Sequence, residues 1–140
     1  MSVFADSSAL VKRYADETGA DEVRALPLLV VSALARVEVP AALWRKVRTG
    51  QLSAADAAVL SVAFRDDCAD PEVMLVVAPT VGVLEHAARL VAVHPLRAYD
   101  AVQLASALEV RAVDGAVDGF ACFDTGLRAA AAAEGLALAV

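Results

Sequence analysis

Met1-Ser-Val-Phe-Ala-Asp6-Ser-Ser-Ala-Leu-Val-Lys12 is the stretch of sequence that decides the fold. The apolar run 3–5 predicts a short buried strand that ends at Asp6, and a helical pattern begins directly after it. Ser7 or Ser8 is expected to cap this helix, and capping by Asp6 itself is the alternative. Ligands of open α/β sheets bind at the carboxyl ends of the strands, so Asp6 is the first candidate functional group.

Strands and helices alternate along the rest of the chain. Compact apolar runs predict four further strands, at 28–31, 73–77, 120–123 and 136–140. Helical patterns lie between them, at 8–17, 20–26, 33–48 (capped by Ser32), 54–68, 80–93, 96–108 and 127–134. Two Asp-Gly turn signals predict a surface loop over 112–119. This alternation predicts a single α/β domain over 1–140, with a mostly parallel five-stranded sheet and helices on both faces.

Composition and charge narrow the class of protein. The 140 residues are 59% hydrophobic, but no apolar run reaches the ~18 residues of a membrane span. The amino terminus lacks the pattern of a signal peptide, and Cys68 and Cys122 form neither a zinc pattern nor a disulfide framework. We therefore expect a cytoplasmic protein with reduced thiols. The net charge of −6 argues against a nucleic-acid partner unless several acids bind metal, in which case it decides nothing.

Two acids stand among apolar positions of predicted helices. Glu38 has only Leu and Ala one turn away on its helix face, and Asp100 stands at the end of a stripe of Leu and Ala. A buried, unpaired carboxylate costs several kcal/mol, so each should be paired, protonated or bound to metal. Pairing with Arg45 is the alternative for Glu38, and capping of a helix is the alternative for Asp100.

Asp124 repeats the pattern of the amino terminus, because it follows the predicted strand 120–123 and precedes a helix. The carboxyl ends of parallel strands share one edge of a sheet, so Asp6 and Asp124 can be neighbours. A single crevice with divalent metal between the acids would compensate the charges of all four: Asp6, Glu38, Asp100 and Asp124. Oxygen ligands without His or Cys favour Mg²⁺ or Mn²⁺ over zinc. Such a site can activate water and stabilise the charge on a phosphoryl group.

Four segments in this order resemble one known family. They are the opening Asp6-Ser-Ser-Ala-Leu-Val-Lys12, the helix around Glu38, Leu96-Arg-Ala-Tyr-Asp100-Ala-Val-Gln-Leu-Ala, and Phe120-Ala-Cys-Phe-Asp124. Together they are similar to the PIN-domain ribonucleases, and above all to the VapC-type toxins of bacterial toxin–antitoxin pairs. The resemblance covers essentially the whole chain.

The resemblance implies a three-layer fold around a five-stranded parallel sheet, and endoribonuclease activity that depends on Mg²⁺ or Mn²⁺. Single-stranded or looped RNA would be cleaved by metal-activated water, and the family's acids map onto Asp6, Glu38, Asp100 and Asp124, with a hydroxyl at Ser8. The implied partners are a second copy of the chain and a small antitoxin that binds DNA.

The RNA backbone would be bound by basic side chains near the acids. The candidates are Arg13, Arg45, Arg97 and Arg128. His86 and His94 have no second ligand at metal spacing, so we predict that both are structural.

Three other classes share parts of this pattern. A receiver domain also gathers acids around Mg²⁺, but it needs a lysine after a late strand, and none follows Lys46. A phosphatase of the haloacid dehalogenase type needs an Asp two residues after the first acid, where this chain has Ser8. The alternative that stays open is a PIN-like binding module without catalytic activity. In such a module the four acids would no longer be assembled into a metal site.

Overall fold

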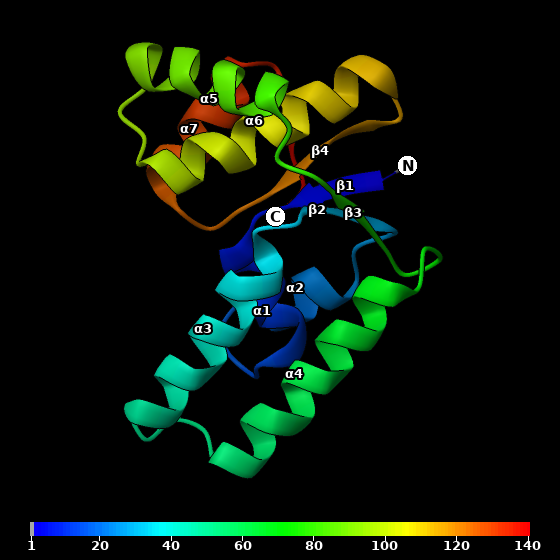
Figure 1. Cartoon of the computed structure of the whole chain (residues 1–140), viewed down its shortest axis with the longest axis vertical. Coiled ribbons are helices and arrows are strands. Elements are labelled where there is room, and N and C mark those ends of the chain that lie inside the picture. Colours follow the sequence, from blue (N-terminus) through cyan, green and yellow to red (C-terminus); the bar gives the residue numbers. More distant parts are fainter. Residues whose placement is uncertain (1) are drawn as a thin grey trace.

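The computed structural model describes residues 2–140 and arranges them in three layers (Figure 1). Five parallel strands form the central sheet in the order β3-β2-β1-β4-β5. The strands are β1 (Ser2–Ala5), β2 (Leu29–Ser32), β3 (Met74–Val77), β4 (Val117–Ala121) and β5 (Ala137–Leu138). The helices are α1 (Ser7–Tyr14), α2 (Ala20–Arg24), α3 (Ala35–Arg48), α4 (Ala54–Ala69), α5 (Val81–Val93), α6 (Ala98–Val113) and α7 (Thr125–Ala133). The predicted α/β class and the parallel five-stranded sheet are confirmed.

Two hydrophobic cores lie on opposite faces of the sheet. Val3 and Ala5 of β1 pack against α1, α2, α3 and α4, whereas Phe4 between them packs against α5, α6 and α7. Figure 1 shows the same division, with α1 to α4 below the sheet and α5 to α7 above it. In the second core the rings of Phe4 and Phe120 stack with their centroids 5.9 Å apart. Because both faces of the sheet are covered, the central strands β1 and β2 are almost wholly apolar in sequence, whereas β4 contains Asp118 and Gly119.

The strand order reverses at β1, which lies at the centre of the sheet between β2 and β4. α1 follows β1 and packs on one face, whereas α7 follows β4 and packs on the other. The amide of Asp6 still donates to the carbonyl of Ala121, at 3.1 Å, and beyond this bond the two segments diverge. Crevices at such reversal points are where open α/β sheets bind ligands. Here Asp6 and Asp124 are both among the residues that line the crevice.

The surface loop predicted over 112–119 is wrong at both ends. α6 continues to Val113 and β4 begins at Val117, so only a short turn connects them. Val117 is buried in the core under α5, α6 and α7, and Gly119 pairs with Val3 in the sheet. A Cβ on Gly119 would lie 3.1 Å from Cγ2 of Val3, so this glycine permits close strand pairing and does not form a turn.

The predicted cap Ser32 is wrong, and for α1 the alternative cap Asp6 is confirmed. Ser32 is the last residue of β2 and is fully buried, and α3 begins after Leu34, which offers no side-chain cap. The hydroxyl of Ser32 accepts a hydrogen bond from the amide of Leu34 at 3.2 Å, so it pairs a backbone amide in the turn before the helix. α1 is capped by Asp6, and not by either serine that follows it. Within residues 2–140, no helix is long and apolar enough to cross a membrane.

Candidate functional site

A cavity of about 500 Å³ lies at the carboxyl edge of the sheet, over the reversal point. Its lining comes from α1, α3, α6 and the segment after β4, which are far apart in the sequence. All four predicted acids are among its lining residues: Asp6, Glu38, Asp100 and Asp124. The predicted convergence of these side chains on one crevice is therefore what the folded chain has, while their roles stay predictions.

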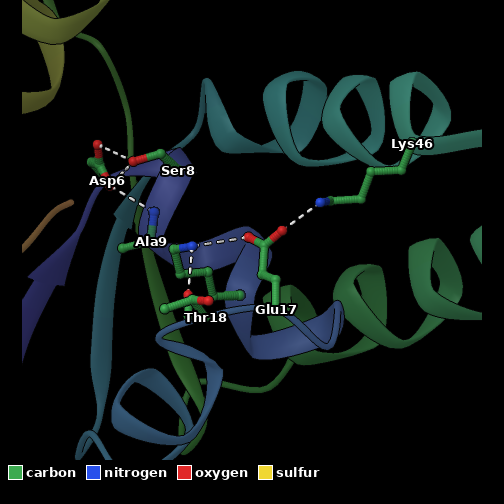
Figure 2. Close-up of polar contacts among 7 residues, drawn as sticks. Asp6, Ser8, Ala9, Glu17, Thr18 and Lys46 are labelled. Atoms are coloured by element: carbon green, nitrogen blue, oxygen red, sulfur yellow. Dashed lines mark hydrogen bonds and ion pairs between the residues drawn. The ribbon is translucent and has the colours of Figure 1, made fainter. Parts of the chain in front are cut away.

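Asp6 is the most buried of the four acids, with 4% of its surface exposed. Its Oδ1 accepts the amide of Ala9 at 2.8 Å, and Oγ of Ser8 lies 2.9 Å from Oδ1 and 2.8 Å from Oδ2 (Figure 2). Burial raises the pKa of Asp6 from 3.8 to about 6, and the nearby charge of Asp100 adds to this rise, although hydrogen bonds from Ala9 and Ser8 oppose it. Asp6 is therefore both the cap of α1 and a member of the acidic cavity.

Asp124 has the same arrangement in an exposed setting. It caps α7, because its Oδ1 accepts the amide of Leu127 at 2.9 Å.

Asp100 lies in the first turn of α6 and its Oδ2 is 3.2 Å from Nε of Arg97. The side chain of Asp100 is 22% exposed, so it lies at the end of the apolar stripe, as predicted, and is only partly buried. Asp100 lines the cavity, and the fully buried residues of α6 begin directly after it, at Ala101.

Glu38 is half-buried, and its predicted burial in an apolar face is wrong. Its Oε1 accepts hydrogen bonds from Oγ of Ser7 at 2.9 Å and from Nε2 of Gln103 at 3.0 Å. The alternative partner, Arg45, lines the cavity but forms no ion pair with Glu38 within residues 2–140. Neither Ser7, which is expected only as a helix cap, nor Gln103 is predicted as a partner of Glu38. A signal for Gln103 was present, because a polar amide stands among Ala and Leu on the helix that begins near Asp100.

Basic side chains form part of the cavity wall. Lys12, Arg45 and Arg97 are among the lining residues. The ammonium of Lys12 lies 4.7 Å from the ring centroid of Phe123, which also lines the cavity. The remaining candidates for RNA contact point elsewhere: Arg13 pairs with Asp67, and Arg128 donates to the carbonyls of Cys122 and Val140.

One acid of the cavity wall is already neutralised. Glu17 accepts hydrogen bonds from Lys12 and Lys46, the second of which is drawn in Figure 2. Burial alone would raise the pKa of Glu17, but these two lysines hold that pKa below its usual value. Glu17 therefore differs from the four predicted acids, none of which is paired with a lysine in the described part of the chain, and we assign it no part in binding a cation.

The donor chemistry of the cavity fits a hard divalent cation. Its lining offers carboxylates and no His or Cys, and such oxygen donors suit Mg²⁺ or Mn²⁺. No lysine or arginine of residues 2–140 forms an ion pair with Asp6, so its buried charge lacks a compensating cation. As the side chains stand, no three His, Cys, Asp or Glu in the described chain are grouped to hold one ion. Metal binding would therefore require the four side chains to move closer together than they stand here.

The two histidines lie outside this cavity. His86 pairs with Glu109 and His94 with Glu134, each at 2.6 Å, so they connect α5 to α6 and to the end of α7. Their predicted structural role agrees with these contacts.

The protein is of the α/β class, and its acids gather where the parallel sheet reverses its strand order. The chain belongs to the PIN domain family, whose model matches residues 3–133. Its fold is similar to that of VapC20 from Mycobacterium tuberculosis, described as a sarcin-ricin loop cleaving toxin. The TM-score is 0.63 at 19% sequence identity, over 96% of this chain and 95% of VapC20. No curated protein sequence matches the chain significantly.

Proposed function

We propose that this protein is a metal-dependent endoribonuclease and the toxin of a type II toxin–antitoxin pair. One observation carries the proposal: Asp6, Glu38, Asp100 and Asp124, distant in the sequence, line a single cavity. Membership of the PIN domain family supports it, as does the likeness of fold to a toxin described as cleaving the sarcin-ricin loop. Its substrate would be single-stranded or looped RNA.

The four acids would hold Mg²⁺ or Mn²⁺, which when bound supplies an activated water and stabilises negative charge on the phosphate. Burial without a basic partner makes the carboxylate of Asp6 a favourable ligand, since a cation would compensate its charge. Ser8 contacts both oxygens of Asp6 and keeps this carboxylate oriented. Lys12, Arg45 and Arg97 would bind the phosphates that flank the scissile bond.

The resemblance to VapC-type toxins also supports the proposed partners. A small DNA-binding antitoxin would neutralise the nuclease, and the protein would act as a homodimer in the cytoplasm. Expression of the chain alone should then arrest growth of a bacterial host, and co-expression of the antitoxin should restore it.

A PIN-like binding module without catalytic activity is the second candidate. The observation that favours it is that Asp6 and Asp124 serve as helix caps, and that no three acids of the described chain are grouped to hold an ion. Calorimetric titration with Mn²⁺ separates the two functions. A nuclease should bind Mn²⁺ tightly, whereas a binding module should show no tight site.

Cleavage of RNA tests the proposal directly. The purified protein should cleave a total RNA pool in Mg²⁺ and fail to cleave it in EDTA, and mapping of the cleavage sites should identify the target. Asp6→Asn should abolish cleavage because it removes a charged ligand. Asp118→Asn is a matched control, since Asp118 is exposed on β4 and outside the cavity. Undiminished cleavage by Asp6→Asn would refute the assignment of the site.

A further inference from the structure

A pair of buried polar side chains, Ser7 and Gln103, lies against Glu38 in the cavity. Ser7 is 8% exposed and Gln103 is 2% exposed. They belong to α1 and α6, and Glu38 belongs to α3, so three helices contribute to one small cluster. Buried polar groups in proteins are retained where they form hydrogen bonds, so this cluster requires an explanation.

The hydrogen bonds of the cluster converge on one oxygen of Glu38. Oγ of Ser7 donates to Oε1 at 2.9 Å, and Nε2 of Gln103 donates to the same Oε1 at 3.0 Å. Nε2 of Gln103 also donates to Oγ of Ser7 at 2.9 Å. Within residues 2–140, no side chain or amide donates to Oε2 of Glu38. One oxygen of the carboxylate is therefore fixed, and the other has no protein partner.

The orientation of the Gln103 amide follows from the same contacts. If the amide were reversed, its oxygen would face an oxygen of Glu38 and two acceptors would meet. With Nε2 turned to Glu38, Oε1 of Gln103 is buried and has no hydrogen-bond partner in the described part of the chain. A methionine would fill a similar volume without leaving an acceptor unpaired. Stability therefore does not explain the glutamine, whereas its donor to Glu38 does.

We propose that Gln103 is a positioning residue for the metal centre. Together with Ser7 it holds Oε1 of Glu38, so that Oε2 is the oxygen presented to a divalent cation. This inference rests on the proposed function, because it takes Glu38 as a metal ligand. Residues that orient metal ligands in this way typically change metal affinity or activity about 10–100-fold when they are replaced.

Calorimetric titration of the whole protein with MnCl₂ tests the proposal. Gln103→Met and Ser7→Ala should each weaken Mn²⁺ binding about 10–100-fold. Ser7→Thr keeps the hydroxyl and should bind Mn²⁺ as the wild type does. Ser106→Ala is the matched control. Ser106 lies on α6, as Gln103 does, and its fully buried hydroxyl donates to the carbonyl of Val102 and not to Glu38. It should leave the affinity for Mn²⁺ unchanged.

Unfolding by urea in EDTA distinguishes positioning from a structural role. The unfolding midpoint of Gln103→Met should equal or exceed that of the wild type, because the orphan acceptor is removed. Weaker Mn²⁺ binding by a variant of undiminished stability is the combination that a structural role does not produce. A destabilised Gln103→Met protein with unchanged Mn²⁺ affinity would overturn the proposal.

Asp6→Asn separates failure of this inference from failure of the proposed function. If Asp6→Asn loses Mn²⁺ binding while Gln103→Met binds as tightly as the wild type, the positioning role is wrong and the metal centre stands. If Asp6→Asn itself binds Mn²⁺ as the wild type does, the metal centre is refuted and this inference falls with it. Should Gln103→Met not fold, unchanged binding by Ser7→Ala overturns the positioning role.

Discussion

Replacement of Asp6 by Asn should stabilise the metal-free protein at neutral and alkaline pH. Burial raises the pKa of Asp6 from 3.8 to about 6. A carboxyl group with a raised pKa binds its proton more tightly in the folded state. Its favourable contribution is therefore full below about pH 4 and is lost as the pH rises to about 6. At about 1.4 kcal/mol for each pKa unit, the loss amounts to about 3 kcal/mol, and Asn avoids it.

The assay is urea unfolding in EDTA at several pH values. The free energy of unfolding of Asp6→Asn should exceed that of the wild type by up to about 3 kcal/mol at pH 8, and the two should be equal at pH 3. Asn caps helices about as well as Asp, so α1 keeps its cap. Asp124→Asn is the matched control, because Asp124 caps α7 in the same way but is exposed.

The difference between the two variants isolates the effect of burial. Asp124→Asn should change stability by less than about 1 kcal/mol, mostly through the lost interaction of its charge with the helix dipole. A metal-free Asp6→Asn protein that is less stable than the wild type at pH 8, or a difference that does not change with pH, would refute the reasoning. It would mean that hydrogen bonds to the Asp6 carboxylate outweigh the cost of its burial.

Three further outcomes can be measured. Mn²⁺ at about 100 times its Kd should stabilise the wild type by about 2.7 kcal/mol in thermal unfolding and should leave Asp6→Asn unchanged; an equal shift in both proteins contradicts the metal site. Arg45→Ala and Arg97→Ala should weaken RNA binding and reduce its dependence on salt in filter-binding assays, whereas Arg13→Ala should not; equal effects of all three would remove the cavity wall as the RNA surface. Phe120→Ala should lower the free energy of unfolding by about 3–5 kcal/mol in urea, because its ring is fully buried against Phe4, and a change below about 1 kcal/mol would show that this core contributes little.

Much of the sheet could be predicted because β1, β2 and the end of β4 are buried on both faces. Such strands are short continuous apolar runs, and the run before Asp6 and the run before Asp124 were both recognised in this way. The meeting of these two acids followed from geometry, since parallel strands end at a common edge. The start of β4 was missed at Val117 because Asp118-Gly119 has the local signature of a turn, and pairing with β1 overrides that signature.

The burial of Glu38 and Asp100 could not be predicted from their helix faces. A helical pattern shows which neighbours are apolar, but not what covers them in the folded chain. Glu38 and Asp100 both line the cavity, so one side of each acid is open although fully buried residues lie next to them on the same helices. Asp6 turned out to be the acid with the most costly environment, because it ends the central strand of the sheet.

The sequence by itself determined that the chain forms a parallel α/β sheet with acids at one edge, because both properties depend on patterns within a few residues. Only the tertiary structure decided which side chains hold each acid. Glu38 takes its partners from 31 residues earlier and 65 residues later in the chain, at Ser7 and Gln103. Those contacts depend on how α1, α3 and α6 pack around the sheet, and packing of separate elements leaves no local signal in a sequence.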